Sequence, residues 1–457
     1  MRLAILAAVL IAIPAAVLAD SPSPRLDRRI EKALADSNAR AESQMKEILE
    51  RELHPGSSLA VIRSAVTFDA CREGVTYLAG DELGGRDTGS EGHRKATEWA
   101  AGVFKEAGLE AVGDGGTYFQ GWRFGKKATR NVVAFLRGET DELVVVGAHL
   151  DHIGTGAPGF FSGRIPNPLA GDDQIYNGAD DNASGSTAVV MMAKALGALK
   201  RKPKRGVLFI LFAGEEKGLL GSGWYVGHPI FPLEKTVAMI NLDMVGRNRD
   251  HACEVLGAEG SPELRSALET ANKRIGMNLT VRTTQIFAQS DQLAFYQKKI
   301  PCLFFTSGGH PQYHTALDHP DLINFGKIEE VAELGASLVL RITRLKTRPT
   351  FRSIPGLGPR LGVTPANLTP DQCDDLGIPK DEGGVLLNAV MEKFPAAAAG
   401  LRAGDVVVSI DGKPLPRKNA LDEFRQKIME AKPGAKQKFG VMRGGMLTTV
   451  TVKYPKD

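Results

Sequence analysis

Long hydrophobic runs are absent from the sequence beyond its first residues, and this absence excludes a membrane-embedded fold for most of the chain. A transmembrane helix needs about 20 consecutive apolar residues, and no stretch after residue 19 provides them. Residues 1–19 carry one positive charge at Arg2, an apolar run, and small residues before Asp20. This pattern predicts a secretory signal peptide, with a retained membrane anchor as the alternative. We therefore expect an extracytoplasmic protein, secreted or periplasmic, without a membrane span after signal removal.

Cysteine is scarce, and a strong charge of one sign is missing. The four cysteines lie far apart and match no closely spaced metal motif: Cys71, Cys253, Cys302 and Cys373. A full disulfide framework, a single bridge and buried free thiols all stay open. The net charge is +4, and the one dense basic run, residues 200–205, contains a proline and fits a solvated loop. A nucleic-acid partner would require a wider basic face, so we expect none.

Several catalytic motifs are also missing. The sequence has no G-x-S-x-G elbow and no phosphate-binding loop, which disfavours a serine hydrolase or a nucleotide enzyme. It has no internal repeat and no low-complexity tract. The length predicts two or three domains at roughly 100–200 residues each.

Apolar periodicity and proline content divide the chain. Residues 20–75 have helical spacing and predict an N-terminal helical segment. Residues 76–345 form the main expected domain, and the proline-rich residues 346–359 are typical of a linker. Residues 360–457 contain short strands around one helix and predict a small β-rich domain.

Apolar strands alternate with helices in the main domain. We expect strands at 131–137, 143–149, 207–213, 237–244 and 301–306, and helices at 186–199, 262–275 and 327–344. This alternation predicts an α/β sandwich, in which helices cover a largely parallel sheet.

Acids and imidazoles recur where these strands end. They occur in five stretches, VVVGAHLDH, YNGADDNASG, VLFILFAGEE, VAMINLDMVG and YHTALDH, and supply His149, Asp181, Glu216, Asp243 and His314. Ligands at the carboxyl ends of neighbouring strands can converge on one point. Five protein ligands exceed the three that are typical of a catalytic mononuclear zinc, so a bridging carboxylate and two metals fit better.

Two neighbouring acids have other expected roles. His149 and Asp151 are two residues apart, so both side chains face the same way on a strand. Asp151 can bind metal, but a carboxylate that orients the His149 ring is the more economical role. Adjacent Glu215 and Glu216 cannot share a direction, so one can bind metal while the other acts as a base.

The ordered motifs H-x-D, D-N-x-S-G, E-E-x-G-L-x-G-S, N-x-D-M and Y-H-T-x-x-D resemble the M28 family of zinc aminopeptidases. The resemblance implies a three-layer sandwich like that of zinc exopeptidases, two Zn²⁺ per chain, and peptide or protein substrates with a free N-terminus. It assigns one metal to His149 and Asp243 and the other to Glu216 and His314, with Asp181 as the bridge.

Further roles follow from the same resemblance. Glu215 is expected to be the general base, and Tyr313 is expected to stabilise the oxyanion. Asp318 is expected to contact a metal ligand without binding the metal itself. A cis peptide is expected between Asp181 and Asn182. Other divalent metals can replace zinc in this reading.

The sequence departs from the family at several places. Residues 153–175, with Phe160 and Phe161, look long for the family and fit a solvated loop or a wall of the substrate pocket. Gln292 follows Ser-Asp where many members have histidine. We interpret Asp180 as a surface or turn acid. Three further histidines are interpreted as polar loop residues, namely His152, His310 and His319.

Alternative functions stay open. An M20-type hydrolase has a similar ligand order but usually inserts a lid domain before the last histidine. A glutaminyl-cyclase-like enzyme keeps one zinc, and a non-catalytic binding protein on this scaffold would have lost ligands.

The C-terminal residues KFPAAAAGLRAGDVVVSIDG, within 393–412, resemble a PDZ domain. In that resemblance the carboxylate-binding loop is Leu361, Gly362 and Val363, and its backbone would capture a peptide terminus by strand addition. A closed groove that acts as a spacer is the alternative.

Overall fold

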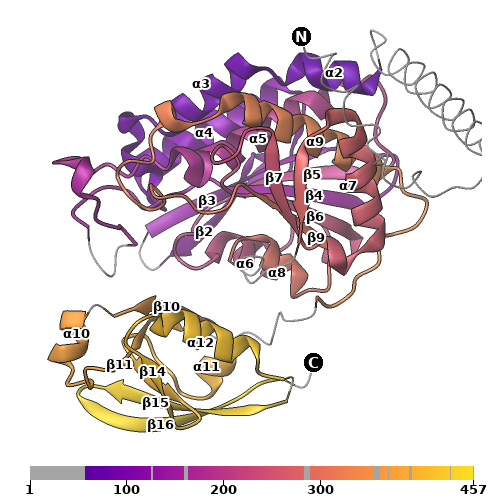
Figure 1. Cartoon of the computed structure of the whole chain (residues 1–457). Helices are drawn as coiled ribbons and strands as arrows, with labels where there is room; N and C mark the ends of the chain where they lie inside the picture. Colours follow the sequence, from indigo (N-terminus) through magenta and orange to yellow (C-terminus); the bar gives the residue numbers. More distant parts are fainter. Residues whose placement is uncertain are drawn as a thin grey trace, which may run out of the picture.

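The computed structural model describes residues 57–124, 127–158, 163–282, 289–354, 361–368, 370–390, 394–432 and 434–455. The predicted signal peptide, residues 20–56, Phe160 and Phe161 lie outside these ranges. The described chain contains two sheets, each with its own hydrophobic core (Figure 1). In this part of the chain, every helix is too short or too polar to cross a membrane.

The larger sheet has nine strands in the order β1-β3-β5-β4-β6-β9-β7-β8, with β2 paired to β3. The strands are β1 (Glu110–Ala111), β2 (Phe119–Phe124), β3 (Lys127–Leu136), β4 (Leu143–His149), β5 (Gly206–Phe212), β6 (Thr236–Leu242), β7 (Ala252–Leu256), β8 (Asn278–Val281) and β9 (Cys302–Thr306). The central strands β5, β4, β6 and β9 are parallel, whereas β3 and β7 join them antiparallel. This arrangement confirms the predicted mixed, largely parallel sheet.

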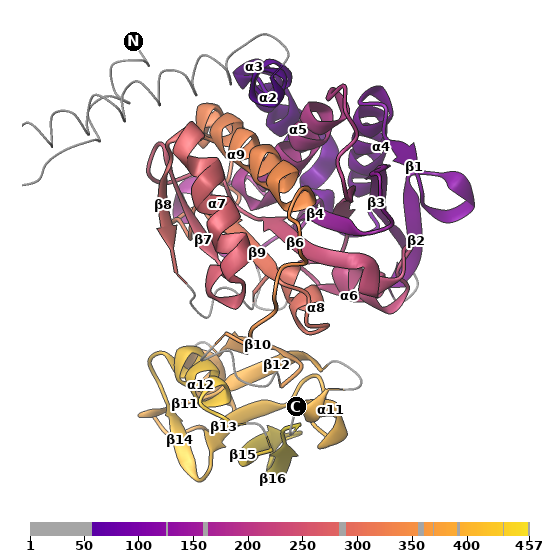
Figure 2. The ribbon, with the colours of Figure 1, turned by 90° about the vertical axis from the view of Figure 1, so that its right-hand side faces the viewer.

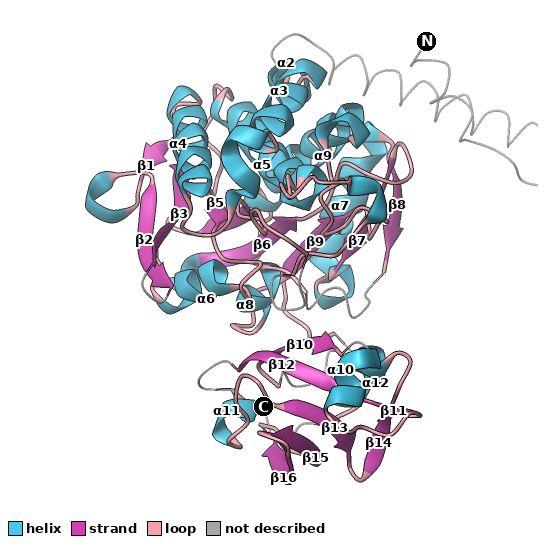
Figure 3. Ribbon diagram, turned by 90° about the vertical axis from the view of Figure 1, so that its left-hand side faces the viewer, coloured by secondary structure: helices cyan, strands magenta, loops and turns pink. Residues whose placement is uncertain are grey.

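Helices cover both faces of this sheet (Figures 2 and 3). One side carries α2 (Ser58–Ala65), α3 (Phe68–Leu78), α4 (Glu91–Glu106), α5 (Gly185–Gly197), α7 (Pro262–Ile275) and α9 (Phe325–Thr343). The other side carries α6 (Leu220–Gly227) and α8 (Gln292–Tyr296). Along β4, Val144 and Val146 join the core on the first side, while Leu143 and Val145 join the core on the second. Successive strand residues point to opposite faces, so a strand buried on both faces is apolar throughout.

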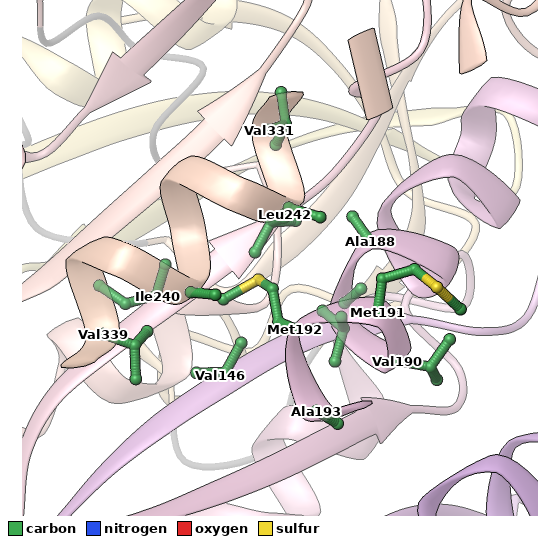
Figure 4. Close-up of a cluster of buried hydrophobic side chains, with 14 of the residues drawn as sticks. Val146, Ala188, Val190, Met191, Met192, Ala193, Ile240, Leu242, Val331 and Val339 are labelled. Atoms are coloured by element: carbon green, nitrogen blue, oxygen red, sulfur yellow. The ribbon is translucent and has the colours of Figure 1, made fainter. Parts of the chain in front are cut away.

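The larger core lies between the sheet and helices α5 and α9 (Figure 4). Met192 of α5 lies near Val146 and Ile240 of the sheet and near Val339 of α9 (Figure 4). Helix α9 approaches α5 closely at Gly335, where a Cβ would lie 2.7 Å from the Met192 sulfur.

Most of the long helices on this face begin with a side-chain cap. The side-chain oxygens of Ser90, Ser261 and Asn324 accept hydrogen bonds from backbone N–H groups at the starts of α4, α7 and α9. Helix α5 lacks such a cap and follows an irregular turn, Ala179–Ser184, instead. That turn carries the predicted bridging acid.

The smaller sheet has seven strands in the order β10-β12-β13-β14-β11, with β15 paired to β13 and β16. Its elements are β10 (Val363–Asn367), α10 (Pro370–Asp375), β11 (Glu382–Gly383), β12 (Val385–Val390), α11 (Pro395–Ala398), β13 (Val406–Ile410), β14 (Lys413–Pro416), α12 (Ala420–Met429), β15 (Lys436–Arg443) and β16 (Met446–Lys453). Phe424 of α12 packs on Phe439 of β15 in a separate core. This is the β-rich fold expected from the sequence.

The first part of the predicted linker packs against the main domain. The Thr350 N–H and hydroxyl donate to the Glu263 carboxylate, and the Ile354 N–H donates to the Tyr296 hydroxyl. Ile354 is 4% exposed and belongs to the hydrophobic core that also contains residues of α8. Residues 348–354 therefore behave as part of the main domain.

All four cysteines are free and buried. Of the alternatives that the sequence left open, the structure has the buried thiols. Strands β1, β2, β7 and β8 were not predicted, and β8 alternates between exposed and half-buried residues, so no continuous apolar run marks it.

Candidate metal centre

The predicted ligands meet at the carboxyl edge of the central parallel strands. Strand β4 ends at His149, β6 is followed directly by Asp243, Glu216 follows β5, and His314 lies in the loop after β9. Because these strands are adjacent and parallel, their carboxyl ends share one edge of the sheet. Side chains from four distant segments can therefore reach one place.

Asp181 lies between the two histidines. Its Oδ1 is 3.2 Å from His149 Nε2, and its Oδ2 is 3.1 Å from His314 Nε2. The residue is 3% exposed, and the Asp181–Asn182 peptide is cis, as the resemblance implied. One carboxylate thus directs one oxygen toward each histidine.

Two groups of candidate ligands share this carboxylate. In the first group, His149 Nε2 also lies 3.2 Å from Asp243 Oδ1. In the second group, His314 Nε2 also lies 3.1 Å from Glu216 Oε2. The structure therefore brings all five predicted ligands together, in the two pairs expected from the sequence.

The donor atoms have the chemistry and spacing that zinc requires. Ligand atoms about 2.0–2.1 Å from a tetrahedral zinc lie roughly 3.3 Å apart, close to the distances seen here. Asp181 Oδ2 and His314 Nε2 are buried, yet neither makes a hydrogen bond to another described residue. Such unpaired buried atoms are costly unless another partner holds them. Imidazole and carboxylate donors around these points fit bound zinc.

The sequence comparisons agree with this geometry. The model of peptidase family M28 matches residues 131–339, which contain all five candidate ligands. The chain carries an M28 peptidase domain. The model of the PDZ domain matches residues 359–454, which contain the smaller sheet.

Known proteins resemble parts of the chain. Aminopeptidase YwaD of Bacillus subtilis is 30% identical over 183 residues, which cover 38% of this chain and 39% of YwaD. Probable leucine aminopeptidase 1 of Trichophyton verrucosum is 26% identical over 232 residues, which cover 48% of this chain and 59% of that protein. The chain therefore spans less than two thirds of the length of either relative. The crystal structure of the Legionella pneumophila LapA aminopeptidase matches with a TM-score of 0.51 and 20% sequence identity. The match covers 63% of this chain and 74% of LapA, and it shows that the two proteins share a fold.

In the M28 domain, the His149 ring has a different hydrogen-bond partner from the one we expected. Its Nδ1–H donates to the backbone carbonyl of Asp151 at 3.1 Å, whereas the Asp151 carboxylate is 4.0 Å away. That carboxylate instead accepts hydrogen bonds from the Thr88 hydroxyl and the Glu215 N–H. Asp151 thus fixes the tautomer of His149 through its main chain, and its side chain positions the loop that carries the two glutamates.

The second histidine of the M28 domain is held by the long loop. His314 Nδ1–H donates to the carbonyl of Gly163 at 3.0 Å, and the Ile165 N–H donates to the carbonyl of His314. His314 itself has a φ of 57°, a conformation that costs energy for a residue with a side chain. Residues 163–165 therefore contact a candidate ligand directly, so this part of the loop is more than a solvated connection.

The acids behind Asp181 form a buried network. Asp318 accepts hydrogen bonds from the backbone N–H groups of Asp180 and Asp181, so it supports the turn rather than a histidine ring. Asp180 lies in the turn, but a surface position for it is wrong, because it is fully buried, accepts a hydrogen bond from the Gly246 N–H and lies 3.4 Å from His310. His310 likewise lies in this buried network rather than in a solvated loop.

The adjacent glutamates have opposite electrostatic environments. Desolvation raises the pKa of Glu215 well above its usual value, and the charges of Glu216 and Asp243 add to the effect. Burial would also raise the pKa of Glu216, but His314 and a hydrogen bond from His152 lower it to about 2.

Tyr313 lies at the mouth of the M28 site. Its ring stacks on the His314 ring, with centroids 3.9 Å apart, and the residue is 39% exposed. The phenol of a tyrosine ordinarily titrates at about pH 10. The hydroxyl therefore stays protonated at neutral pH and can donate a hydrogen bond.

Two site features escaped prediction from sequence. His152, interpreted as a polar loop residue, is fully buried, and its Nδ1 lies 2.9 Å from Glu216 Oε1. Its place three residues after His149 was the available signal. Gln292, at the position of the missing histidine, accepts a hydrogen bond from Asn241, which also donates to Ser290. Glutamine is thus accommodated in a buried amide network.

Proposed function

We propose that the protein is a zinc-dependent aminopeptidase that holds two zinc ions and hydrolyses N-terminal peptide bonds. The observation that carries the proposal is the position of Asp181, with one oxygen near His149 and the other near His314. A single carboxylate placed between two ligand sets suits a bridged pair of metals. The M28 domain and the aminopeptidase relatives support the same activity.

The residues divide into two metal positions in this proposal. His149 and Asp243 would hold one zinc, Glu216 and His314 would hold the other, and Asp181 would offer one carboxylate oxygen to each. Bound zinc would supply Lewis-acid activation of water and of the scissile carbonyl.

The remaining groups move protons and stabilise charge. Glu215 takes a proton from the attacking water and returns it to the leaving amine. Tyr313 donates a hydrogen bond to the oxygen that becomes negative in the tetrahedral intermediate.

Zinc content and substrate preference test this function together. We expect two zinc ions per purified chain, activity on amino-acid anilides with a free amine, and loss of activity after chelation that zinc restores. The N-acetylated anilides serve as the control and should resist cleavage. A wild-type count of one zinc, or cyclisation of N-terminal glutamine without anilide cleavage, would favour the cyclase-like alternative, and a protein inert on all substrates would favour the binding scaffold.

We further propose that the protein is exported and that its PDZ domain recruits peptides. Residues 1–19 have the composition of a signal peptide. In the PDZ domain, Gly362 has a φ of 78°, and a Cβ there would lie 2.0 Å from the Phe394 Cβ, so this loop requires glycine. Strand β10 follows this loop directly and pairs with β12. An added peptide would pair with β10 and so extend the sheet by one strand.

Truncation separates the two domains. A protein that ends at Ile354 should stay folded and cleave a small anilide at nearly the full rate, because every proposed metal ligand and catalytic residue precedes the cut. Cleavage of long peptides should show a higher KM and an unchanged kcat if the PDZ domain raises the local substrate concentration. Steady-state kinetics on both substrates check this expectation.

A shorter protein that ends at Lys346 is the matched control. It loses the contacts of Thr350 and Ile354 with the main domain. Burial of an isoleucine side chain stabilises by about 1.5–3 kcal/mol, so its Tm should fall by about 5 °C or more relative to the longer truncation. Loss of anilide turnover in the folded protein that ends at Ile354 would contradict the modular arrangement.

A further inference from the structure

His152 is the buried group of the centre that the proposed reaction does not use. It follows the end of β4, is fully buried, and its backbone N–H donates to the carbonyl of Arg86. Its ring packs against Gly178, where a Cβ would lie 2.5 Å from the ring carbons. The glycine leaves the space that the imidazole fills, so the ring has one well-defined place.

Arg86 fixes the backbone on both sides of this ring. The residue is fully buried. Its guanidinium donates hydrogen bonds to four backbone carbonyls, those of Leu78, Leu150, Asn177 and Gly178. These bonds join the segment that carries His152 to the turn that leads into Asp181. The ring position is therefore held by the main chain of two segments.

The His152 ring contacts one carboxylate oxygen of Glu216, a candidate zinc ligand. His152 Nδ1 lies 2.9 Å from Glu216 Oε1 and 3.7 Å from Asp181 Oδ2. Its ring also meets the His314 ring edge-to-face, with centroids 5.6 Å apart. The second oxygen of Glu216, Oε2, is the one that lies 3.1 Å from His314 Nε2. The two oxygens of Glu216 thus have different partners.

We propose that His152 is a positioning residue, which donates its Nδ1–H to Glu216 Oε1 and so turns Glu216 Oε2 toward the zinc position shared with His314 and Asp181. An ionised carboxylate only accepts hydrogen bonds, so the proton at this contact belongs to the imidazole. His152 Nε2 is buried and makes no hydrogen bond within the described residues, so the ring has a single polar contact to lose. The inference rests on the proposed dizinc function.

A hydrogen bond explains the contact better than direct ligation. His152 Nδ1 faces a carboxylate oxygen at hydrogen-bond distance, whereas His314 Nε2 lies 3.1 Å from both Asp181 Oδ2 and Glu216 Oε2 and already supplies an imidazole donor for that zinc position. Groups that orient a metal ligand in this way typically contribute about 10–100-fold to metal affinity.

Two substitutions at His152 separate the hydrogen bond from the shape of the ring. His152→Phe keeps the ring volume against Gly178 and removes the donor, whereas His152→Asn keeps an N–H near the position of Nδ1. Exposed His228 supplies the control His228→Phe. Zinc affinity is measured on metal-free full-length protein by competition with a chromogenic zinc chelator, and folding by circular dichroism.

We expect His152→Phe to bind one of its two zinc ions about 10–100-fold more weakly, with the other zinc unchanged. His152→Asn should recover most of that affinity, and the visible spectrum of its cobalt-substituted form should match the wild type. The inference is overturned if the phenylalanine variant binds both ions normally, if both ions are lost together, or if asparagine gives no recovery and an altered cobalt spectrum. A wild-type protein that binds fewer than two zinc ions would instead overturn the proposed function, so the two failures are distinguishable.

Discussion

Asp181→Ala is expected to remove both zinc ions at once. The Asp181 carboxylate approaches His149 with one oxygen and His314 with the other, so both metal positions lose a ligand in a single substitution. Loss of Lewis-acid activation, which is worth several kcal/mol, should lower the anilide turnover by about a thousandfold or more. Metal analysis after dialysis and steady-state kinetics measure the two effects.

The turn around Asp181 should survive this substitution, because Asp318 holds it through the backbone N–H groups of Asp180 and Asp181. His314→Ala is the comparison and should deplete mainly one zinc. Asp172→Ala, at an exposed acid of the same loop region, should change neither zinc content nor rate. Retention of one tightly bound zinc by folded Asp181→Ala would show that the carboxylate serves a single metal.

Much of this site could be read from the sequence because its ligands follow locally recognisable strands. The apolar runs that end near His149, Glu216 and Asp243 are visible without tertiary information, and parallel strands place their carboxyl ends at one edge. Asp181 was found in the same way, as an acid directly before an apolar helix. The order of elements and the side on which each strand ends placed the candidate ligands at one edge, whereas their division into two metal pairs and the choice of Asp181 as the bridge came from the M28 resemblance.

The errors lie where the chain leaves regular structure. The rule that residues two apart share a direction holds within a strand, but β4 ends at His149. Asp151 therefore presents its carbonyl to the His149 ring and its carboxylate elsewhere. His152 follows the same irregular segment, and whether it turns inward depends on Gly178 and Arg86, which are distant in sequence.

Asp180 illustrates a second limit. An acid in a Gly- and Asn-rich turn is usually solvated, and nothing local distinguishes it from a cap. Its burial depends on partners from two distant loops, the N–H of Gly246 and the ring of His310. Contacts of this kind become visible only when the segments are assembled.

Glu215→Gln is expected to keep both zinc ions and to lose about 10²–10⁴-fold in kcat, the usual contribution of a general base. Glutamine has nearly the same shape but cannot accept the proton of the attacking water. The backbone N–H of residue 215 still donates to Asp151, so the loop should keep its position. Metal analysis and single-turnover rates on an anilide measure zinc content and chemistry separately.

Glu216→Gln is the matched control, since it makes the same replacement of a carboxylate by an amide at the adjacent glutamate. Glu216 Oε2 lies 3.1 Å from His314 Nε2, so this variant should lose zinc from one of the two positions. It keeps Glu215, so proton transfer should not be the function that fails first. The pair of variants thus assigns base and ligand by different readouts. Near-normal turnover in zinc-loaded Glu215→Gln would remove Glu215 from the role of base, and equal zinc loss in both variants would mean that the two glutamates act together as ligands.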